Sequence, residues 1–571
     1  MNVFRQASSW RSVVDRWTPA SILTLRHYTG VAFTADLIAG VTVGLVALPL
    51  AMAFAISSGV PPQAGLYCAV VTGFLISALG GSRFQIGGPT GAFVVVVSGI
   101  VATYGIDGLF MCTMMAGVIL IALGATGMGA AVRYIPRPVI VGFTNGIAVL
   151  IASTQIRDFF GLKMTTVPGA FWPRLVELAG QASTWSPAAT GLACLALVTM
   201  LVWNRFVGRI PGYIVVLLAG TAIVATLKLP VETIGSRFGG IPQGWPPLVI
   251  PRFHIGLIPT LAAPALTIAL LGALESLMSA VVADRMGGDR HNPNVELIAQ
   301  GIANVVSPLF GGLPATGAIA RTATNIRSGA RTPIAGIIHA LTLLAVLLVA
   351  APLARFIPLG VLAAILLVVA YNMGEWAEIP ELLKLTRMDI SVWLVTFGLT
   401  VFADLTIAVE VGLVLAMLLF IRKVSMTTTV SRVTSDYVES GRLHILQGKH
   451  IPDYVSVFRI HGPFLFGASD KIRQILDEVP ALAPIVIIRL RNMTAIDATG
   501  LRALEDLAEG LHASGRSLIL CGAPHQPASL MRQAEFHDHV GEENICPNID
   551  AALRRAAAVR FKDVVPEAGI S

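Results

Sequence analysis

The sequence predicts a polytopic α-helical membrane domain of about fourteen transmembrane segments, followed by a soluble α/β domain. The 571-residue chain is 55% hydrophobic and 13% charged, and its mean hydropathy is +0.75. Soluble domains carry about 25% charged residues, so this composition is typical of a membrane protein. Charge-free stretches long enough for helices of roughly 20 apolar residues recur between Asp36 and Ile421.

Changes in composition along the chain predict where its domains begin and end. From about Ser435, alternating strands and amphipathic helices have an ordinary charge density, which indicates a soluble domain. We therefore expect an N-terminal cytoplasmic segment (1–35), a transmembrane domain (36–422, with repeats over about 36–228 and 254–422), a linker (423–440), an α/β domain (441–560) and a tail (561–571).

Basic residues are distributed unevenly between the predicted loops. An even number of crossings places both ends of the membrane domain on one side, and the loops on that side carry more Lys and Arg. The positive-inside tendency then predicts a multi-pass protein of the cell inner membrane with both termini in the cytoplasm. The same bias accounts for the net charge of +7, so we expect no nucleic-acid partner. The five cysteines form no CxxC motif, and we expect no metal site and no disulfide framework.

Two interrupted apolar segments indicate an internal repeat. Residues 84–93 (FQIGGPTGAF) resemble residues 310–319 (FGGLPATGAI) at an offset of 226, which aligns Thr90 with Thr316. A second, apolar match upstream keeps the same offset. Paired Gly/Pro breaks at corresponding places in two halves are a sequence indicator of a transporter binding site.

Each break predicts a new helix start at membrane depth. A helix start leaves backbone N–H groups without partners and carries a partial positive charge of roughly half a unit. If the two copies are inverted, both starts point toward the middle of the membrane, where they could bind an anion. Arg321 lies about one turn into the second of these helices and would add a permanent positive charge.

Several motifs resemble those of the SulP family of anion transporters. They include GGSRFQIGGPTGAFVVVV, ALESLMSAVVAD, GGLPATGAIARTATNIRSGARTPIAG and RIHGPFLFGASDKI, and the resemblance covers nearly the whole chain. It implies seven-plus-seven inverted repeats like those of uracil permeases. It also implies a core domain formed by the first four helices of each repeat, a gate domain, a cytoplasmic STAS domain and a homodimer.

The resemblance also implies a set of site residues. The anion would lie between the starts of the third and tenth helices, with the first helix as a wall; the residues are Thr90, Gly91, Ala92, Phe93, Ile319, Ala320, Arg321, Leu50 and Phe54. Many relatives carry Gln or Glu at the position of Leu50, so a proton-coupling role proposed for the acidic form is unavailable here.

Glu275 is the single carboxylate between Arg252 and Asp284, and we expect it to couple transport to a cation. It could bind a proton with the substrate or, together with Ser279, ligate Na⁺. The alternative is a salt bridge to Arg321 that only neutralises the carboxylate. We expect no cofactor apart from H⁺ or Na⁺ as a coupling ion.

These observations predict a secondary active transporter for sulfate or a similar oxyanion, coupled to protons. The alternatives are a C4-dicarboxylate symporter for succinate or fumarate and a Na⁺/bicarbonate symporter. A passive anion channel is disfavoured, because a water-filled pore needs polar faces along several helices and these helices are almost uniformly apolar. No nucleophile–base pair indicates an enzyme.

In the STAS domain, Ala498 replaces the serine that is phosphorylated in anti-sigma-factor antagonists, and we expect Thr499 to cap the following helix. We expect the domain to bind a regulatory partner.

Overall fold

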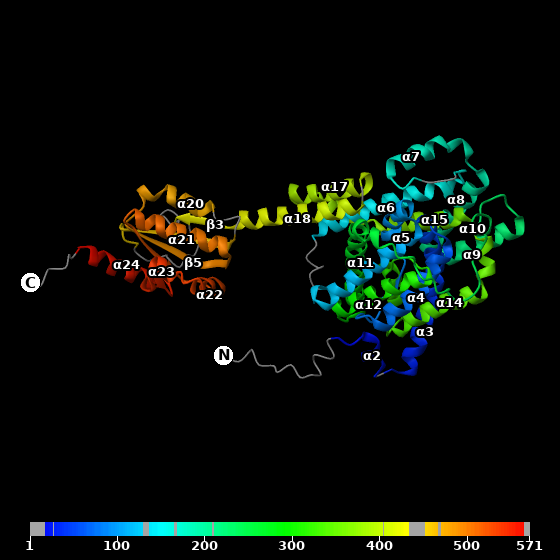
Figure 1. Cartoon of the computed structure of the whole chain (residues 1–571), viewed down its shortest axis with the longest axis horizontal. Helices are drawn as coiled ribbons and strands as arrows, with labels where there is room; N and C mark the ends of the chain where they lie inside the picture. The colour runs from blue at the N-terminus through cyan, green and yellow to red at the C-terminus, as the bar shows by residue number, and fades with distance from the viewer. Residues whose placement is uncertain are drawn as a thin grey trace, which may run out of the picture. The chain divides into compact units, whose positions relative to one another are not determined.

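The computed structural model describes residues 17–564 except 27, 130–135, 165–167, 208–210, 404, 433–450 and 466–469. Its packing divides the chain into two compact units, Met1–Val414 and Leu415–Ser571 (Figure 1). The division falls inside helix α18 (Leu405–Thr427), before the residues expected as a linker. Each unit is described separately below.

Helices form almost all of the described part of the first unit. Their bounds are α2 (Ala20–Leu25), α3 (Gly30–Ser57), α4 (Pro62–Leu79), α5 (Gly91–Ala125), α6 (Arg137–Phe160), α7 (Phe171–Gly180), α8 (Pro187–Phe206), α9 (Gly212–Leu227), α10 (Ile234–Phe238), α11 (Ile258–Gly287), α12 (Pro293–Val306), α13 (Ile319–Arg327), α14 (Ile334–Val349), α15 (Leu359–Met373), α16 (Ile379–Leu382) and α17 (Arg387–Phe402).

Six helices in the described part of the chain are long and apolar enough to cross a membrane. They are α3, α4, α5, α6 and the two helical stretches that contain α11 and α15; α8, α9 and α14 are apolar but shorter. Helix α5 also changes direction at Gly105, whose φ of 70° is not helical. The predicted number of about fourteen crossings stays a prediction.

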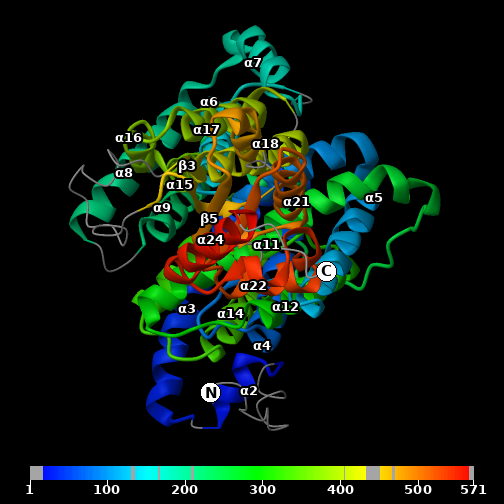
Figure 2. The same cartoon turned by 90° about the vertical axis from the view of Figure 1, so that its left-hand side faces the viewer.

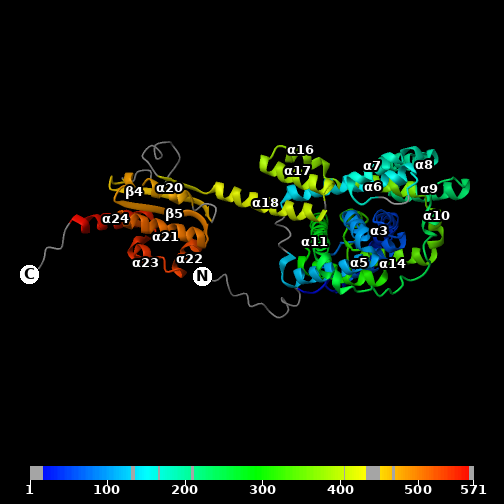
Figure 3. The ribbon, with the colours of Figure 1, turned by 45° about the horizontal axis from the view of Figure 1, so that its top comes forward.

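The helices of the first unit pack in two groups. In the first group, α12 packs against α4 and α5, α14 against α3 and α4, and α11 against α5 and α13. In the second group, α6 packs against α15 and α17, and α8 packs against α15 and α9. Figures 1 and 2 show α6, α8 and α17 gathered near α7, away from α4, α12 and α14, and Figure 3 shows α6 and α8 beside α7, away from α14. We call the first group the core and the second group the gate.

Two short strands join the two halves of the core. Strand β1 (Gly87–Gly88) precedes α5, strand β2 (Thr316–Gly317) precedes α13, and the strands pair antiparallel with Gly87 opposite Gly317 and Gly88 opposite Thr316. Their hydrogen bonds satisfy backbone groups that would otherwise be unpaired at membrane depth. We call β1 and β2 the crossover strands.

The crossover strands correct the register of the sequence repeat. Thr90 is the N-cap of α5, whereas Thr316 lies within β2, so the sequence-based alignment of these two threonines was wrong. The two Thr-Gly-Ala tripeptides use glycine for different contacts. A Cβ at Gly91 would lie 2.6 Å from Met373 Sδ, and a Cβ at Gly317 would lie 1.9 Å from Gln85 Nε2. Each glycine is closely packed, but not at equivalent places.

The second unit contains a five-stranded sheet in the order β3-β4-β5-β6-β7. Its strands are β3 (Thr429–Arg432), β4 (Val455–Phe464), β5 (Ile485–Ile496), β6 (Ser517–Cys521) and β7 (Ile545–Cys546); all neighbouring pairs are parallel except β3–β4. Its helices are α20 (Asp470–Asp477), α21 (Ala498–Ala513), α22 (His525–Gln533), α23 (His537–Val540) and α24 (Ile549–Val564). Residues from α20, α21 and α22 cover one face of the sheet, and residues from α24 cover the other.

The cap of α21 differs from the sequence expectation. Asp497, not Thr499, is the N-cap, and its Oδ1 accepts a hydrogen bond of 2.8 Å from the N–H of Gly500. Thr499 already lies inside the helix and is exposed. The extended backbone of Asp497 (φ −112°) places its short carboxylate over the first turn, as N-caps require.

Asp497→Ala is predicted to loosen the first turn of α21. Loss of an N-cap costs about 1 kcal/mol, so amide hydrogen exchange at Gly500 in the full-length protein should accelerate by about fivefold. Thr499→Ala is the matched control and should leave exchange at Gly500 unchanged. Equal acceleration in the two variants would contradict the assignment of the cap.

Candidate functional site

A cavity of about 580 Å³ lies between the core and the gate of the first unit. The starts of α5 and α13 meet at this cavity, with α3 and α11 on the core side and α6, α9 and α15 on the gate side. Nine of the residues expected from the sequence line it: Leu50, Phe54, Thr90, Gly91, Ala92, Glu275, Ile319, Ala320 and Arg321. The cavity therefore brings together residues that are more than 200 positions apart in the chain.

Both helix starts at the cavity lack a side-chain cap. Neither the side chain of Thr90, the N-cap of α5, nor that of Ala318, the N-cap of α13, accepts a hydrogen bond from its own helix. Among the hydrogen bonds of the described residues, none engages the N–H groups of Gly91, Ala92 or Ile319. These donors, and the partial positive charge of each helix start, are available to an anion in the cavity.

Arg321 extends from α13 to the start of α5. Its side chain is buried, with 3% of the residue exposed, and its guanidinium donates a hydrogen bond to the carbonyl oxygen of Pro89. Gly88 makes this position possible, because a Cβ there would lie 2.6 Å from Arg321 Nη1. Gly88 also has a φ of 148°, which other residues rarely adopt. The backbone at the end of β1 is thus shaped around the guanidinium.

Glu275 occupies the same wall of the cavity as Thr90. Thr90 Oγ1 donates a hydrogen bond of 2.8 Å to Glu275 Oε2. No ion pair of 4.0 Å or less between the described residues joins Glu275 to Arg321, so the salt bridge considered as an alternative is absent here. Glu275 and Arg321 therefore both line the cavity without neutralising each other by direct contact.

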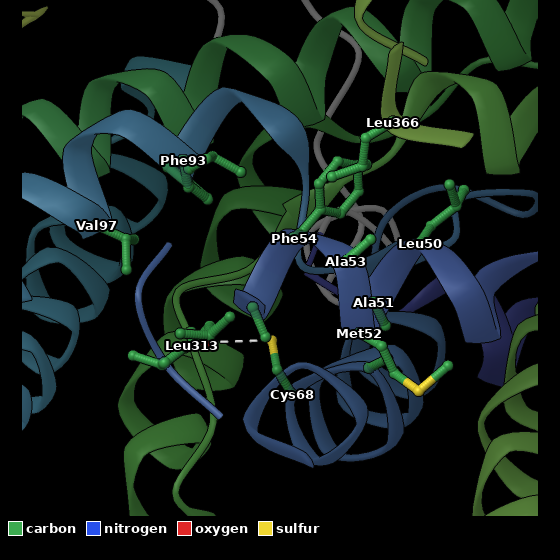
Figure 4. Packing of buried hydrophobic residues seen from close by; sticks show 14 of the residues in the cluster. Leu50, Ala51, Met52, Ala53, Phe54, Cys68, Phe93, Val97, Leu313 and Leu366 are labelled. Atoms are coloured by element: carbon green, nitrogen blue, oxygen red, sulfur yellow. Dashed lines mark hydrogen bonds between the residues drawn. The ribbon is translucent and has the colours of Figure 1, made fainter. Parts of the chain in front are cut away.

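Two expected site residues do not line the cavity. Ser279 is fully buried and its hydroxyl donates to Thr322 Oγ1 at 3.1 Å, which in turn accepts a hydrogen bond from Ile86 N–H. Phe93 points into the core, where a Cβ added at Gly272 would lie 3.6 Å from its ring. Figure 4 shows Phe93 together with Leu50 and Phe54 in the buried hydrophobic cluster. Ser279 supports α13 from behind, and the helical turn directs Phe93 away from Gly91.

The gate contributes cavity residues that were not expected from the sequence. Their polar members are Thr144 on α6, Tyr213 on α9, Asn372 on α15 and Glu375 just after α15. Tyr213 and Asn372 interact through their side chains. None of these residues belongs to the paired Gly/Pro breaks at residues 84–93 and 310–319, so the signal used to find the core residues was missing. An Asn at the end of an otherwise apolar helix was the single available indication.

The cavity opens toward the side of the membrane domain on which α3 begins. Its gate residues come from the first half of α6, the start of α9 and the end of α15, and Arg327 at the end of α13 also lines it. The chain after Arg327 returns to the start of α3, where the N–H groups of Arg331 and Thr332 donate to Asp36. At the opposite ends of α3 and α6, Gln155 Nε2 donates to Ser57 Oγ at 3.1 Å and joins the gate to the core.

Comparisons with known proteins agree with this architecture. Residues 33–396 match the sulfate permease family, and residues 448–552 match the STAS domain. The chain is 41% identical over 521 residues to YvdB of Bacillus subtilis, covering 91% of this chain and 97% of that protein. It is 31% identical over 540 residues to the bicarbonate transporter BicA of Picosynechococcus, covering 91% of this chain and 94% of BicA.

Solved structures give the same result for the fold. The chain matches the structure of SLC26A9 with a TM-score of 0.86 at 19% identity, over 98% of this chain and 96% of that chain. It also matches the transmembrane domain of a cyanobacterial BicA with a TM-score of 0.58 at 34% identity, over 68% of this chain and 97% of that chain. The predicted helical membrane domain followed by a STAS domain is confirmed.

Cysteine labelling can test which side of the membrane domain the cavity faces. Thr144→Cys, in a Cys194→Ser background, is predicted to react with a membrane-impermeant maleimide added on the side where α3 begins, because Thr144 lines the open cavity. Thr113→Cys is the control, because Thr113 is fully buried outside the cavity and should stay unlabelled. Labelling of the first variant only from the opposite side would show that the cavity opens the other way.

Proposed function

Because the chain belongs to the sulfate permease family of anion transporters, we propose that it moves a small oxyanion, with sulfate as the first candidate, across the cytoplasmic membrane by alternating access. The observation that supports this proposal most strongly is the cavity itself. The permanent guanidinium charge of Arg321 and two helix starts without side-chain caps face the same space. A tetrahedral oxyanion offers acceptors in several directions and suits donors that converge from opposite sides.

Arg321 supplies the charge that attracts the anion. It uses one donor on Pro89 and keeps others for a ligand, since a guanidinium has five N–H groups. In a cavity walled by apolar residues such as Leu50 and Phe54, the attraction between this charge and an anion is stronger than in water. The N–H groups of Gly91, Ala92 and Ile319 complete the set of donors without adding a side chain that could lose its charge.

Glu275 provides the coupling to protons in this proposal. An ionised carboxylate beside the anion site repels the substrate, so protonation of Glu275 removes one negative charge from the cavity. The proton then enters with the anion, and a lower pH on the side of uptake favours binding. The hydrogen bond from Thr90 holds the carboxylate next to the start of α5, where this repulsion is felt.

Alternating access follows from the division between core and gate. The anion site lies entirely on the core, whereas Thr144, Tyr213 and Asn372 belong to the gate. A displacement of the core along the gate would close the present opening and open the other side. The hydrogen bond between Ser57 and Gln155 would break in this movement. With both termini in the cytoplasm, as we propose from the charge bias, the present conformation faces inward.

Bicarbonate is the second candidate substrate. Two cyanobacterial proteins named as bicarbonate transporters are 31% and 32% identical to this chain over 91% of its length. Na⁺ would then replace H⁺ as the coupling ion. Succinate or fumarate is a third candidate, because Leu50 and Phe54 give the cavity an apolar wall that suits a carbon chain.

We also propose that the protein forms a homodimer and that its STAS domain binds a regulatory partner. Both proposals rest on the family resemblance. Neither is needed for the transport mechanism described above.

Uptake by proteoliposomes containing the full-length protein tests the proposed function. Labelled sulfate should accumulate when an inward proton gradient is imposed, and unlabelled sulfate should compete better than bicarbonate or succinate. Accumulation of bicarbonate driven by a Na⁺ gradient would favour the second candidate. Flux that runs down the anion gradient alone and ignores both cation gradients would contradict a secondary transporter and indicate a channel.

Arg321→Ala is predicted to abolish anion binding while the protein stays folded. Loss of a buried charged hydrogen-bond donor costs about 3 kcal/mol or more in binding, or at least about 100-fold in affinity. Binding can be measured by isothermal titration in detergent, with circular dichroism as the check on folding. Arg327→Ala is the control, because Arg327 lies at the mouth of the cavity and should change affinity by about threefold or less. An unchanged affinity in Arg321→Ala would refute the site.

Glu275→Gln is predicted to separate anion flux from the proton gradient. The amide resembles the protonated carboxyl group in shape and charge, so the variant should exchange sulfate across the bilayer without accumulating it. Exchange and accumulation are measured in the same vesicles at two external pH values. Proton-driven accumulation that persists at the wild-type level would exclude Glu275 as the coupling group.

A further inference from the structure

One face of α12 carries three buried polar side chains, Glu296, Gln300 and Asn304. Their spacing of four residues places them in a row along the helix, and each residue is at most 1% exposed. Helix α12 packs inside the core against α4 and α5. Burial of polar groups is costly unless they find partners, and Glu296 and Asn304 find theirs on the segments that carry the crossover strands, while Gln300 donates to Glu296. We call the three residues the α12 ladder.

Glu296 holds the loop between α4 and β1. Its Oε2 accepts hydrogen bonds from the N–H groups of Gly81 at 2.9 Å and Ser82 at 3.1 Å. Its Oε1 accepts from the amides of Gln85 at 3.0 Å and Gln300 at 2.9 Å. An ionised carboxylate has about four acceptor positions, and these four donors occupy them. The loop that leads into β1 is therefore fixed to α12 by backbone and side-chain contacts.

Asn304 holds the residue that precedes β2. Its Oδ1 accepts from the N–H of Ala315 at 2.8 Å, and its Nδ2 donates to the carbonyl oxygen of the same residue at 2.8 Å. The side-chain amide thus pairs with Ala315 as a neighbouring strand would. Nδ2 also donates to the carbonyl of Gln300 at 2.8 Å, which ties Asn304 to the middle residue of the ladder.

Gln85 connects the ladder to the helix that carries Glu275. Besides its bond to Glu296, its Nε2 donates to the carbonyl of Ser276 at 3.1 Å. Ser276 in turn accepts from the N–H of Gly317 in β2 through its hydroxyl at 3.1 Å. The ladder, β1, β2 and α11 thus form one continuous hydrogen-bond network behind the cavity. None of the three ladder residues lines the cavity.

We propose that the α12 ladder is a positioning device that fixes both crossover strands, and through them sets the distance between Arg321 and the start of α5. The inference rests on the proposed function, because it assigns the ladder to the same anion site. The ladder acts from behind, through Pro89, which follows β1, and through the start of α13, which follows β2. It allows the core to move as a rigid body while the donors around the anion keep their geometry.

A role in packing alone would need no such arrangement. Apolar side chains could fill the same volume beside α4 and α5, and replacement of buried polar networks by apolar residues is often neutral for stability. The ladder instead directs its acceptors and donors to specific backbone groups at Gly81, Ser82 and Ala315. Removal of the ladder's hydrogen bonds should therefore disturb the geometry of the anion site more than it lowers the stability of the fold.

Glu296→Gln and Asn304→Ala test the two ends of the ladder separately in the full-length protein. The first keeps the shape of the side chain but turns an NH₂ group toward donors, and the second removes both bonds to Ala315. Thr113→Val is the matched control, because it removes a fully buried hydroxyl that bonds only to Leu109 in its own helix. Hydrogen exchange is measured over residues 86–92 and 315–322, and KM and maximal rate for sulfate are measured in proteoliposomes.

The proposal expects exchange over both segments to accelerate in each ladder variant but not in Thr113→Val. It also expects KM to rise by about tenfold or more while the maximal rate falls by about threefold or less. Faster exchange with an unchanged KM, or a KM that rises equally in Thr113→Val, would overturn the positioning role. Failure of the proposed function has a different signature: in that case wild-type protein binds no anion, or Arg321→Ala binds it as wild type does, whatever the ladder variants show.

Discussion

The contact between the Arg321 guanidinium and the Pro89 carbonyl is the constraint on which the rest of the site depends. A permanent charge at membrane depth is expensive, and it persists only in a protein interior or a wet cavity. Here it is held between two broken helices, with the glycine at position 88 making room for it. The charge belongs to one repeat and the carbonyl to the other, so the contact joins the two halves of the core at the anion site.

Broken helices impose a second requirement, because their unpaired backbone must be satisfied without closing the cavity. The crossover strands satisfy some of these backbone groups by pairing with each other. The α12 ladder satisfies others by forming hydrogen bonds with the loop before β1 and the residue before β2. The N–H groups at the starts of α5 and α13 are left over, and they face the cavity. The backbone groups behind the crossover strands are therefore hydrogen-bonded within the protein, while the N–H groups in front of them stay free to bind an anion.

The sequence was sufficient to predict the two broken helices, because glycine and proline cluster at residues 87–89 and 311–314, whereas the isolated Pro49 and Pro264 lie inside helices. Arg321 and Glu275, which the sequence indicated, both line one cavity, and their roles there stay predictions. Phe93 and Ser279 do not line it, because a helical turn directs Phe93 to another side and Ser279 supports Thr322 from behind. Local similarity between the two repeats also gave the wrong register, since identical tripeptides can serve different contacts.

The gate residues and the α12 ladder could not be predicted in this way, since each depends on which distant helices pack together. The proposed anion site between Arg321 and the two helix starts is tested most directly by locating a bound anion. Diffraction data collected at the selenium edge, from the full-length protein with selenate, should show selenium within hydrogen-bonding reach of Arg321 and the two helix starts. A selenium site elsewhere, in protein whose sulfate uptake selenate inhibits, would contradict the central claim.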